Sequence, residues 1–229
     1  MTLIRRKVAA VLATGALACS LGVVTATPAH ADEPCTITGF SPRSITVGLN
    51  PKVATFKPTV TGCDLQGWSI QGGDYDFYVY DGSPQWSFAP YDNDEAFAKD
   101  VVVEAYNADY DSRIRAFTDA FKVRRNTVWD QFNASPEPVR KGSKITIKGR
   151  LRVVDWEQEK YVGYAGRAVR VEYRTKTGSY RLIKTVTSGS GGYVSTTVNA
   201  SADGYWRLRY TGGTVAGVST VTGDFVDVR

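Results

Sequence analysis

The sequence predicts an all-β protein: two tandem β-sandwich domains that follow a secretory signal peptide. Three observations lead to this prediction. Apolar and polar residues alternate with a period of two in many short segments, glycine-rich breaks separate these segments, and two stretches of the chain repeat one pattern. No segment after residue 31 shows the spacing of a convincing amphipathic helix. The expected domains are residues 32–126 and 127–229.

Residues 1–31 have the three regions of a signal peptide. A positive start at 5–7 precedes an apolar run over 8–24, and Ala29-His30-Ala31 places small residues at the −3 and −1 positions of a cleavage site. We expect cleavage after Ala31 and a secreted, extracellular or wall-associated protein. Lipidation at Cys19 is the alternative, although the residues before it match a lipobox poorly. No membrane span is expected in the mature chain, because no other stretch reaches about 20 apolar residues.

Removal of the signal peptide excludes several kinds of site. The remaining chain has 25 Lys and Arg against 23 Asp and Glu, so we do not expect a nucleic-acid-binding protein. His30 is the only histidine, so neither Ser-His-Asp nor Cys-His catalysis nor a Cys/His zinc site is expected. Cys35 and Cys63 should pair in an oxidising compartment and close a loop of about 29 residues.

Two stretches of the chain, 41–48 and 135–142, share the pattern S-P-x-x-[IV]-x-x-G at an offset of 94 residues. Each half also ends on a similar segment, at 121–124 and 225–229. Two domains of one architecture explain these similarities better than a single large fold. The boundary between them is expected near 125–131.

Strand-forming segments follow one another along both halves. In the first half they are 36–40, 44–47, 54–60, 68–70, 75–80, 98–106 and 116–123. Parts of the last two, 96–104 and 113–121, could be read as helix, but the Val101-Val102-Val103 run favours strand. In the second half they are a segment around Val139, then 145–151, 169–173, 180–186, 193–198, 206–210 and 225–228. Seven short strands in about 95 residues are typical of a β-sandwich.

The second half also resembles a known family. The segments SPEPVRKG at 135–142, YVGYAGR at 161–167 and DGYWR at 203–207 are similar to the immunoglobulin-like C-terminal module of many secreted proteins from high-GC Gram-positive bacteria. The resemblance implies tandem immunoglobulin-like β-sandwiches and an extracellular location, and it implies no established activity. The core cysteines of antibody domains are missing from this half.

The first candidate binding site is the long segment 154–164, which joins two expected strands. It contains three aromatic residues, Trp156, Tyr161 and Tyr164, beside carboxylates. Long loops on a sandwich often carry binding sites, and aromatic rings with carboxylates suit the stacking and hydrogen bonding of sugars. The alternative is that these aromatics fold back and cover the open end of the sandwich.

The second candidate is a basic sheet face. If the register follows the alternation, four arginines point outward together, with Arg181 or Lys184 on the next strand: Arg170, Arg174, Arg207 and Arg209. Residues 32–124 carry 8 basic and 14 acidic groups, whereas 125–229 carry 17 and 9. Such a face would attract a cell-envelope polysaccharide or an acidic protein. The alternatives are a solvated surface that Glu172 and Asp227 partly neutralise, or attraction between the two halves.

The third candidate is a weak calcium site at Asp92, Asp94 and Glu95, with further acidic pairs at 74 and 76 and at 109 and 111. None of these segments matches an EF-hand loop, and Asx turns need no ion.

We therefore expect a non-catalytic protein without a cofactor that acts in binding or adhesion at the cell envelope or outside the cell. An extracellular polymer hydrolase with paired carboxylates is the alternative, as is a purely structural, calcium-stabilised module. Neither the ligand nor the oligomeric state follows from the sequence.

Overall fold

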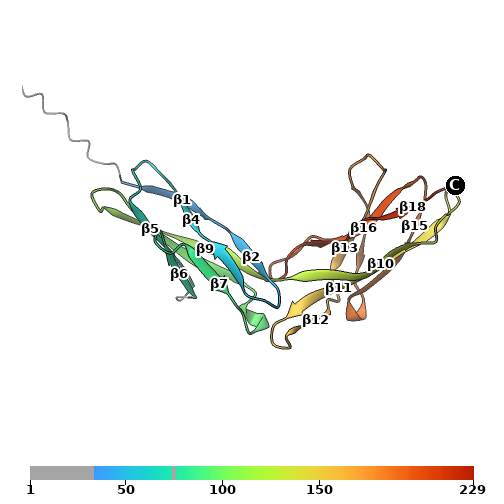
Figure 1. Cartoon of the computed structure of the whole chain (residues 1–229), viewed down its shortest axis with the longest axis horizontal. Helices are drawn as coiled ribbons and strands as arrows, with labels where there is room; N and C mark the ends of the chain where they lie inside the picture. The colour runs from blue at the N-terminus through green and yellow to red at the C-terminus, as the bar shows by residue number, and fades with distance from the viewer. Residues whose placement is uncertain (1–33, 74–75) are drawn as a thin grey trace, which may run out of the picture. The chain divides into compact units, whose positions relative to one another are not determined.

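The computed structural model describes residues 34–73 and 76–229 (Figure 1). The predicted signal peptide and its cleavage site, Cys19 and Asp74 lie outside the described residues. Within the described residues the secondary structure is β-strand, apart from two three-residue 3-10 helices, η1 (Asn93–Glu95) and η2 (Ser190–Gly192). The all-β prediction is confirmed, including for the two segments that could have been read as helix.

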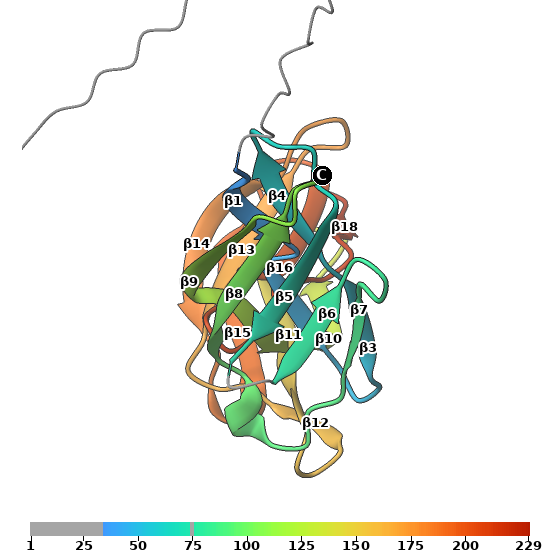
Figure 2. The same cartoon turned by 90° about the vertical axis from the view of Figure 1, so that its left-hand side faces the viewer.

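The first half, residues 34–126, forms two layers. One layer consists of two strand pairs, β1 (Thr36–Ser41) with β4 (Lys57–Thr61) and β3 (Lys52–Thr55) with β7 (Gln85–Phe88). The other is a five-stranded sheet in the order β2 (Ser44–Val47), β9 (Ser112–Arg125), β8 (Ala98–Tyr106), β5 (Gly67–Gly72) and β6 (Phe77–Tyr80). Figure 2 shows β9, β8, β5 and β6 side by side in this layer.

The second half, residues 127–229, repeats this plan. In one sheet β11 (Lys144–Asp155) pairs with β10 (Thr127–Ser135), β12 (Lys160–Gly163) and β15 (Tyr193–Asn199). In the other the order is β14 (Arg181–Thr187), β13 (Ala168–Arg174) and β16 (Gly204–Tyr210), and β16 also pairs with β17 (Ser219–Thr220) and β18 (Asp224–Val226).

The two halves share one topology. Each half has seven main strands if β3–β4 and β17–β18 each count as one and β2 and β12 are left out. The first, second and fifth form one layer: β1, β3–β4 and β7 in the first half, and β10, β11 and β15 in the second. The fourth, third, sixth and seventh form the other: β6, β5, β8 and β9, and β14, β13, β16 and β17–β18. The segment after each S-P motif runs parallel to the last strand of its half, at Ser44–Val47 beside Lys122–Arg125 and at Val139 beside Val228. The sequence repeat therefore corresponds to a structural repeat, and the arrangement is immunoglobulin-like, as predicted. The domain bounds 32–126 and 127–229 stay a prediction.

Alternating side chains build the interior of each half. In β8, Val101, Val103 and Ala105 are fully buried while the residues between them face outward. The first core is rich in phenylalanine, with Phe56 stacked on Phe77 at 4.8 Å between ring centroids. The second core is mainly aliphatic. This one-sided burial is what a period-two pattern in an antiparallel sheet produces.

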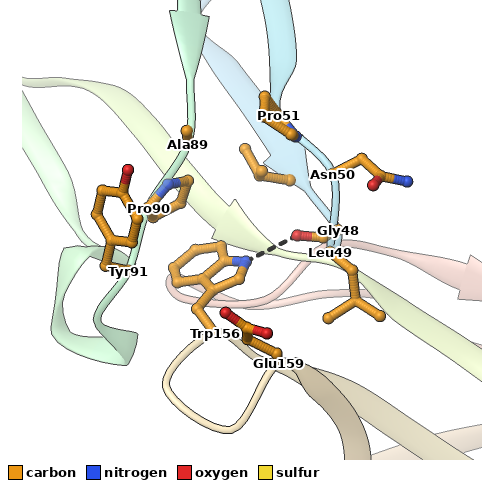
Figure 3. A pocket seen from close by; sticks show the side chains of 10 residues that line it. Gly48, Leu49, Asn50, Pro51, Ala89, Pro90, Tyr91, Trp156 and Glu159 are labelled. Carbon is orange, nitrogen blue, oxygen red and sulfur yellow. Dashed lines mark hydrogen bonds between the residues drawn. The ribbon is translucent and has the colours of Figure 1, made fainter.

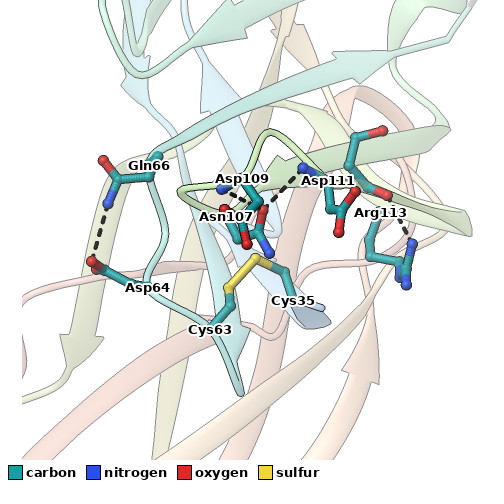
Figure 4. Close-up of a disulfide and its surroundings, with 9 residues drawn as sticks. Cys35, Cys63, Asp64, Gln66, Asn107, Asp109, Asp111 and Arg113 are labelled. Carbon is teal, nitrogen blue, oxygen red and sulfur yellow. Dashed lines mark hydrogen bonds between the residues drawn. A yellow bond between two sulfur atoms is a disulfide. The ribbon is translucent and has the colours of Figure 1, made fainter. Parts of the chain in front are cut away.

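The predicted disulfide is confirmed. Cys35 and Cys63 are bonded, and they join the segment before β1 to the segment after β4 (Figure 4). The two strands already pair, from Thr36 opposite Thr61 to Ser41 opposite Lys57. The bond therefore fixes the outer end of an existing strand pair.

Three expectations about strands were wrong. The expected strand 54–60 is interrupted at buried Phe56, whose N–H donates to the Pro84 carbonyl instead of a strand ladder. The strands β7, β10, β12 and β17 were not expected. The strand expected around Val139 is a single isolated bridge to Val228.

The expected long loop after residue 151 is mostly a β-hairpin. The strand β11 continues to Asp155, which pairs with Lys160 of β12, so that only 156–159 form the turn. Glu159 closes this turn with φ +49°, a left-handed conformation that non-glycine residues seldom adopt. The turn has no Asn-Gly or Asp-Gly signal, which is why the sequence did not reveal the hairpin.

Candidate functional site

The turn of the β11–β12 hairpin places Trp156 against the first half. Its indole is 6% exposed and belongs to the hydrophobic core of that half. The indole N–H donates to the Gly48 carbonyl at 3.0 Å (Figure 3), and the backbone N–H donates to Asn93 Oδ1 at 3.1 Å. Trp156 is thus a buried, hydrogen-bonded anchor between two segments far apart in the sequence.

Asn93 is the centre of the polar contacts around this anchor. Its Nδ2 donates to Asp155 Oδ1 at 3.0 Å and to Glu157 Oε1 at 3.1 Å. Asp155 also accepts from the backbone N–H of Gln158 at 3.0 Å. The hydrogen bond from Asn93 is the main reason why the pKa of Asp155 lies below its ordinary value of 3.8.

Of the other two aromatics of the predicted site, Tyr161 packs against the same core as Trp156, whereas Tyr164 belongs to the core of the second half. The Tyr161 hydroxyl accepts a hydrogen bond from Asn126 Nδ2 at 2.8 Å. Tyr164 is buried and packs edge-on against Tyr210 at 5.8 Å, and burial raises the pKa of Tyr210 to about 12. The structure does not bring the three rings together in one open site. Their contacts agree with the alternative of covering aromatics, and ligand binding by Trp156, Tyr161 and Tyr164 stays a prediction.

A cavity of about 360 Å³ lies over the Trp156 indole, between segments 47–51 and 89–91 (Figure 3). Tyr91 stands at its edge with 83% of its surface exposed, and Glu159 supplies one carboxylate. The lining is otherwise formed largely by proline and aliphatic residues. This cavity could not be predicted from the sequence, because its walls come from three separate segments.

The register of the second half confirms the predicted arginine alternation. On β13 and β16, Arg170 lies opposite Arg209, Glu172 opposite Arg207, and Arg174 opposite Tyr205. Directly opposite residues share a side of the sheet, and the residues between them are buried. We call the outward side chains Arg170, Arg174, Arg207 and Arg209 the arginine face.

A chain of ring and ion contacts runs along the arginine face. The Arg174 guanidinium lies 4.2 Å from the Tyr205 ring and 5.2 Å from the Tyr180 ring. Arg207 lies 3.6 Å over Tyr180 and binds Glu172 Oε2 through Nη2 at 2.7 Å. We call this series of contacts the arginine ladder. Tyr205 could have been found from the sequence, because it has the same parity as the outward arginines of its strand.

Glu172 neutralises part of the face, as the alternative interpretation expected. Its side chain is only 3% exposed, and its two carboxylate oxygens bind Arg207 and, at 2.9 Å, Nε of Arg170. One buried carboxylate therefore holds two arginines in fixed positions. The predicted Asp227 lies instead beside Arg229, at 2.9 Å.

The expected contribution of Arg181 or Lys184 to this face was wrong. A β-bulge in the β13–β14 pair places Lys184 opposite inward-facing Val171, and its Nζ donates to the Thr197 carbonyl of the other sheet. Arg181 lies opposite Tyr173 and over its ring at 5.6 Å. The outward position beside Arg170 belongs to Thr185.

The acidic segment at Asp92, Asp94 and Glu95 forms a capping box around η1. Asp92 Oδ1 accepts from the N–H of Asp94 at 2.8 Å, and Glu95 Oε1 accepts from the N–H of Asp92 at 3.0 Å. Near the disulfide, Asn107 Oδ1 accepts from the N–H groups of Asp109 and Asp111 (Figure 4). Residues 34–73 and 76–229 contain no group of three or more His, Cys, Asp or Glu residues placed to hold a metal ion. The calcium site stays a prediction.

The sequence matches no protein-family model and no curated protein. The solved structures that are distantly similar include the following three. PorU from Porphyromonas gingivalis has 13% identity and a TM-score of 0.33 over 90% of this chain, which spans only 21% of that chain. A 1.5-MDa bacterial ice-binding adhesin has 14% identity and a TM-score of 0.28, with coverage of 86% and 66%.

The D00-D0 domain of intimin has 12% identity and a TM-score of 0.30, with coverage of 84% of this chain and 98% of that one. Likeness at this level carries no argument about function. Within the described part of the chain, no helix has the length and apolar character needed to cross a membrane.

Proposed function

We propose that this chain is an extracellular, non-catalytic binding protein that holds an anionic cell-envelope polysaccharide on its arginine face. The observation that carries the proposal is the arginine ladder. Stacking on Tyr180 and Tyr205 and pairing with Glu172 hold the long arginine side chains in place. Because these side chains are already ordered in the folded protein, less side-chain conformational entropy is lost on binding.

Charge supports an anionic partner. Residues 125–229 carry 17 basic and 9 acidic groups, a net charge of +8, against −6 for residues 32–124. Glu172 is the one acidic residue at the outward positions of β13 and β16, and four arginines share these positions. The positive potential of such a surface concentrates polyanions near it, and salt screens the attraction.

The location and the absence of catalysis are parts of the same proposal. The signal-like residues 1–31, the Cys35–Cys63 disulfide and the resemblance to modules of secreted high-GC Gram-positive proteins support an extracellular location. The chain after residue 31 has no histidine to serve as a base. Glu159 is the one acid among the described residues that line the cavity over Trp156, whereas glycoside hydrolysis needs a pair of carboxylates.

Binding of the purified protein to immobilised polysaccharides tests this proposal. We expect retention on an acidic polysaccharide and not on neutral dextran, with affinity falling as salt rises from about 0.05 to about 0.5 M. Arg207→Glu should abolish retention, whereas Lys57→Glu, the same charge reversal on the first half, should not. Salt-independent binding, retention on neutral dextran, or capture of acidic proteins alone would contradict the proposal. Release of soluble sugar would support the hydrolase instead.

A further inference from the structure

The four arginines of the face differ in how many hydrogen-bond donors they have left. Arg174 is stacked on two rings, and its Nη1 donates to the carbonyls of Thr175 and Lys176 at 3.2 and 2.7 Å. Arg207 gives both Nε and Nη2 to Glu172. These two side chains are largely committed to the arginine ladder.

Arg170 and Arg209 are not committed in this way. Arg170 gives only Nε to Glu172, and its side chain is 39% exposed. The Arg209 side chain makes no hydrogen bond, ion pair or ring contact with any residue of the described ranges. The two lie directly opposite each other on β13 and β16. Like charges in this position repel each other, so an anion between them would stabilise the pair.

Two hydroxyls extend this cationic pair on both sides. Thr185 of β14 lies opposite Arg170, and Thr220 of β17 lies opposite Arg209. Both threonines are exposed. The four residues therefore form one row across four neighbouring strands, about 14 Å long at the usual strand spacing. Every side chain in the row can donate a hydrogen bond on the same side of the sheet.

We propose that the row Thr185–Arg170–Arg209–Thr220 is the contact site for a phosphate or sulfate ester group of a polyanionic polysaccharide. Guanidinium groups bind such oxyanions through two parallel hydrogen bonds, and the three free oxygens of a sulfate ester or phosphate monoester can serve both arginines. A planar carboxylate has only two oxygens, enough for one such paired contact. The threonines stand at the two ends of the row, where they would donate to hydroxyls or ester groups of neighbouring sugars. The proposal rests on the proposed function and names its ligand chemistry and its contact residues.

Affinity measurements with defined polyanions test the row. The probes are dextran sulfate, polyphosphate, polygalacturonate as the carboxylate polymer, and free inorganic sulfate. We expect Arg209→Gln to weaken binding of the first two by about tenfold or more, because a charged hydrogen bond is lost. Arg209→Lys keeps the charge but lacks the planar guanidinium, so its affinity should lie between those of the wild type and Arg209→Gln. Lys148→Gln, the same loss of charge on the opposite sheet, should bind like the wild type.

The outcomes separate this inference from the proposed function. If the wild type binds no polyanion, both fail. If it binds and Arg209→Gln binds equally well, or if polygalacturonate binds more tightly than dextran sulfate, only the row assignment fails. If sodium chloride displaces the polymer as effectively as free sulfate at the same ionic strength, the specific oxyanion contact is refuted. The thermal unfolding midpoint of Arg209→Gln should not fall below that of the wild type, because the Arg209 side chain makes no polar or ring contact and its loss removes the repulsion from Arg170.

Discussion

The two halves have the same strand order but carry different chemistry on equivalent sheet faces. In the first half the strands equivalent to β13 and β16 are β5 and β8, whose outward side pairs Ser69 with Glu104 and Gln71 with Val102, without an arginine. In the second half the equivalent positions form the arginine face. The inward positions are apolar in both. Inward residues therefore specify the fold, and outward residues are free to differ between copies of it.

The halves also differ in how their other layer is built. In the second half the 12-residue strand β11 runs through the whole layer and pairs with three strands. In the first half this layer is two separate strand pairs, divided at Phe56, and the disulfide closes one of them. The interrupted layer is the one with the covalent bond, and predictions can test whether that bond compensates for it.

The largest expected effect comes from Trp156, which belongs to the second half by sequence and to the core of the first half by packing. Trp156→Ala should lower the free energy of unfolding by about 3–5 kcal/mol, because it empties a buried site and leaves the Gly48 carbonyl without its donor. Chemical denaturation measures this loss. Tyr91→Ala, an exposed aromatic at the same cavity, should change stability little. Similar stability for both variants would mean that Trp156 is no anchor.

Removal of the disulfide should have the next largest effect, confined to the first half. The double variant Cys35→Ser with Cys63→Ser should lose about 3–4 kcal/mol, the loop-closure entropy of about 29 residues. Chemical denaturation would measure the lost stability, and hydrogen exchange of the folded variant would show which strands lose protection. Equal loss of protection in β13 and β16 would contradict the view that the bond serves only the interrupted layer.

The smallest expected effect concerns acid stability at Asp155. Its folded pKa is lowered, so its contribution is complete above the ordinary value of 3.8 and is lost as pH falls through the folded pKa. Thermal midpoints of the wild type and Asp155→Asn should therefore differ most near neutral pH and converge in strong acid. Asp109→Asn is the matched control on an exposed turn. A constant difference at every pH would show that Asp155 acts without its charge.

Much of the fold could be predicted because alternation reports directly on burial. The segments around β8, β13 and β16 alternate strictly, and all three are strands with the expected face inward. The hairpin at 152–163 could not be predicted, because its turn depends on a left-handed Glu159 and on packing of Trp156 against a distant segment. The conformation of that turn depends on tertiary contacts, which a local sequence pattern does not contain.

The candidate site divides in the same way. The arginine face follows from parity alone within two strands, so the sequence was sufficient there. The prediction that Arg181 or Lys184 of β14 joins this face was wrong. One bulge between Val171 and Glu172 shifts the inward and outward positions of β14. The role of Asn93 was missed entirely: in the sequence it is one polar residue among acidic ones, and only the fold brings it to Asp155 and Glu157.

The parallel pairing at the end of each half has a consequence for the response to mechanical tension. In the first half β2 lies beside β9 over four residue pairs, Ser44–Val47 with Lys122–Arg125. In the second half the corresponding parallel contact within the described residues is one bridge, Val139 with Val228. Three backbone hydrogen bonds join its two segments, from Val139 to Asp227, from Arg229 to Val139 and from Lys141 to Arg229. Pulling on the two ends of either half would shear these parallel segments past each other, so that their hydrogen bonds share the load. Under such a force the second half would yield first, while the first half remained folded.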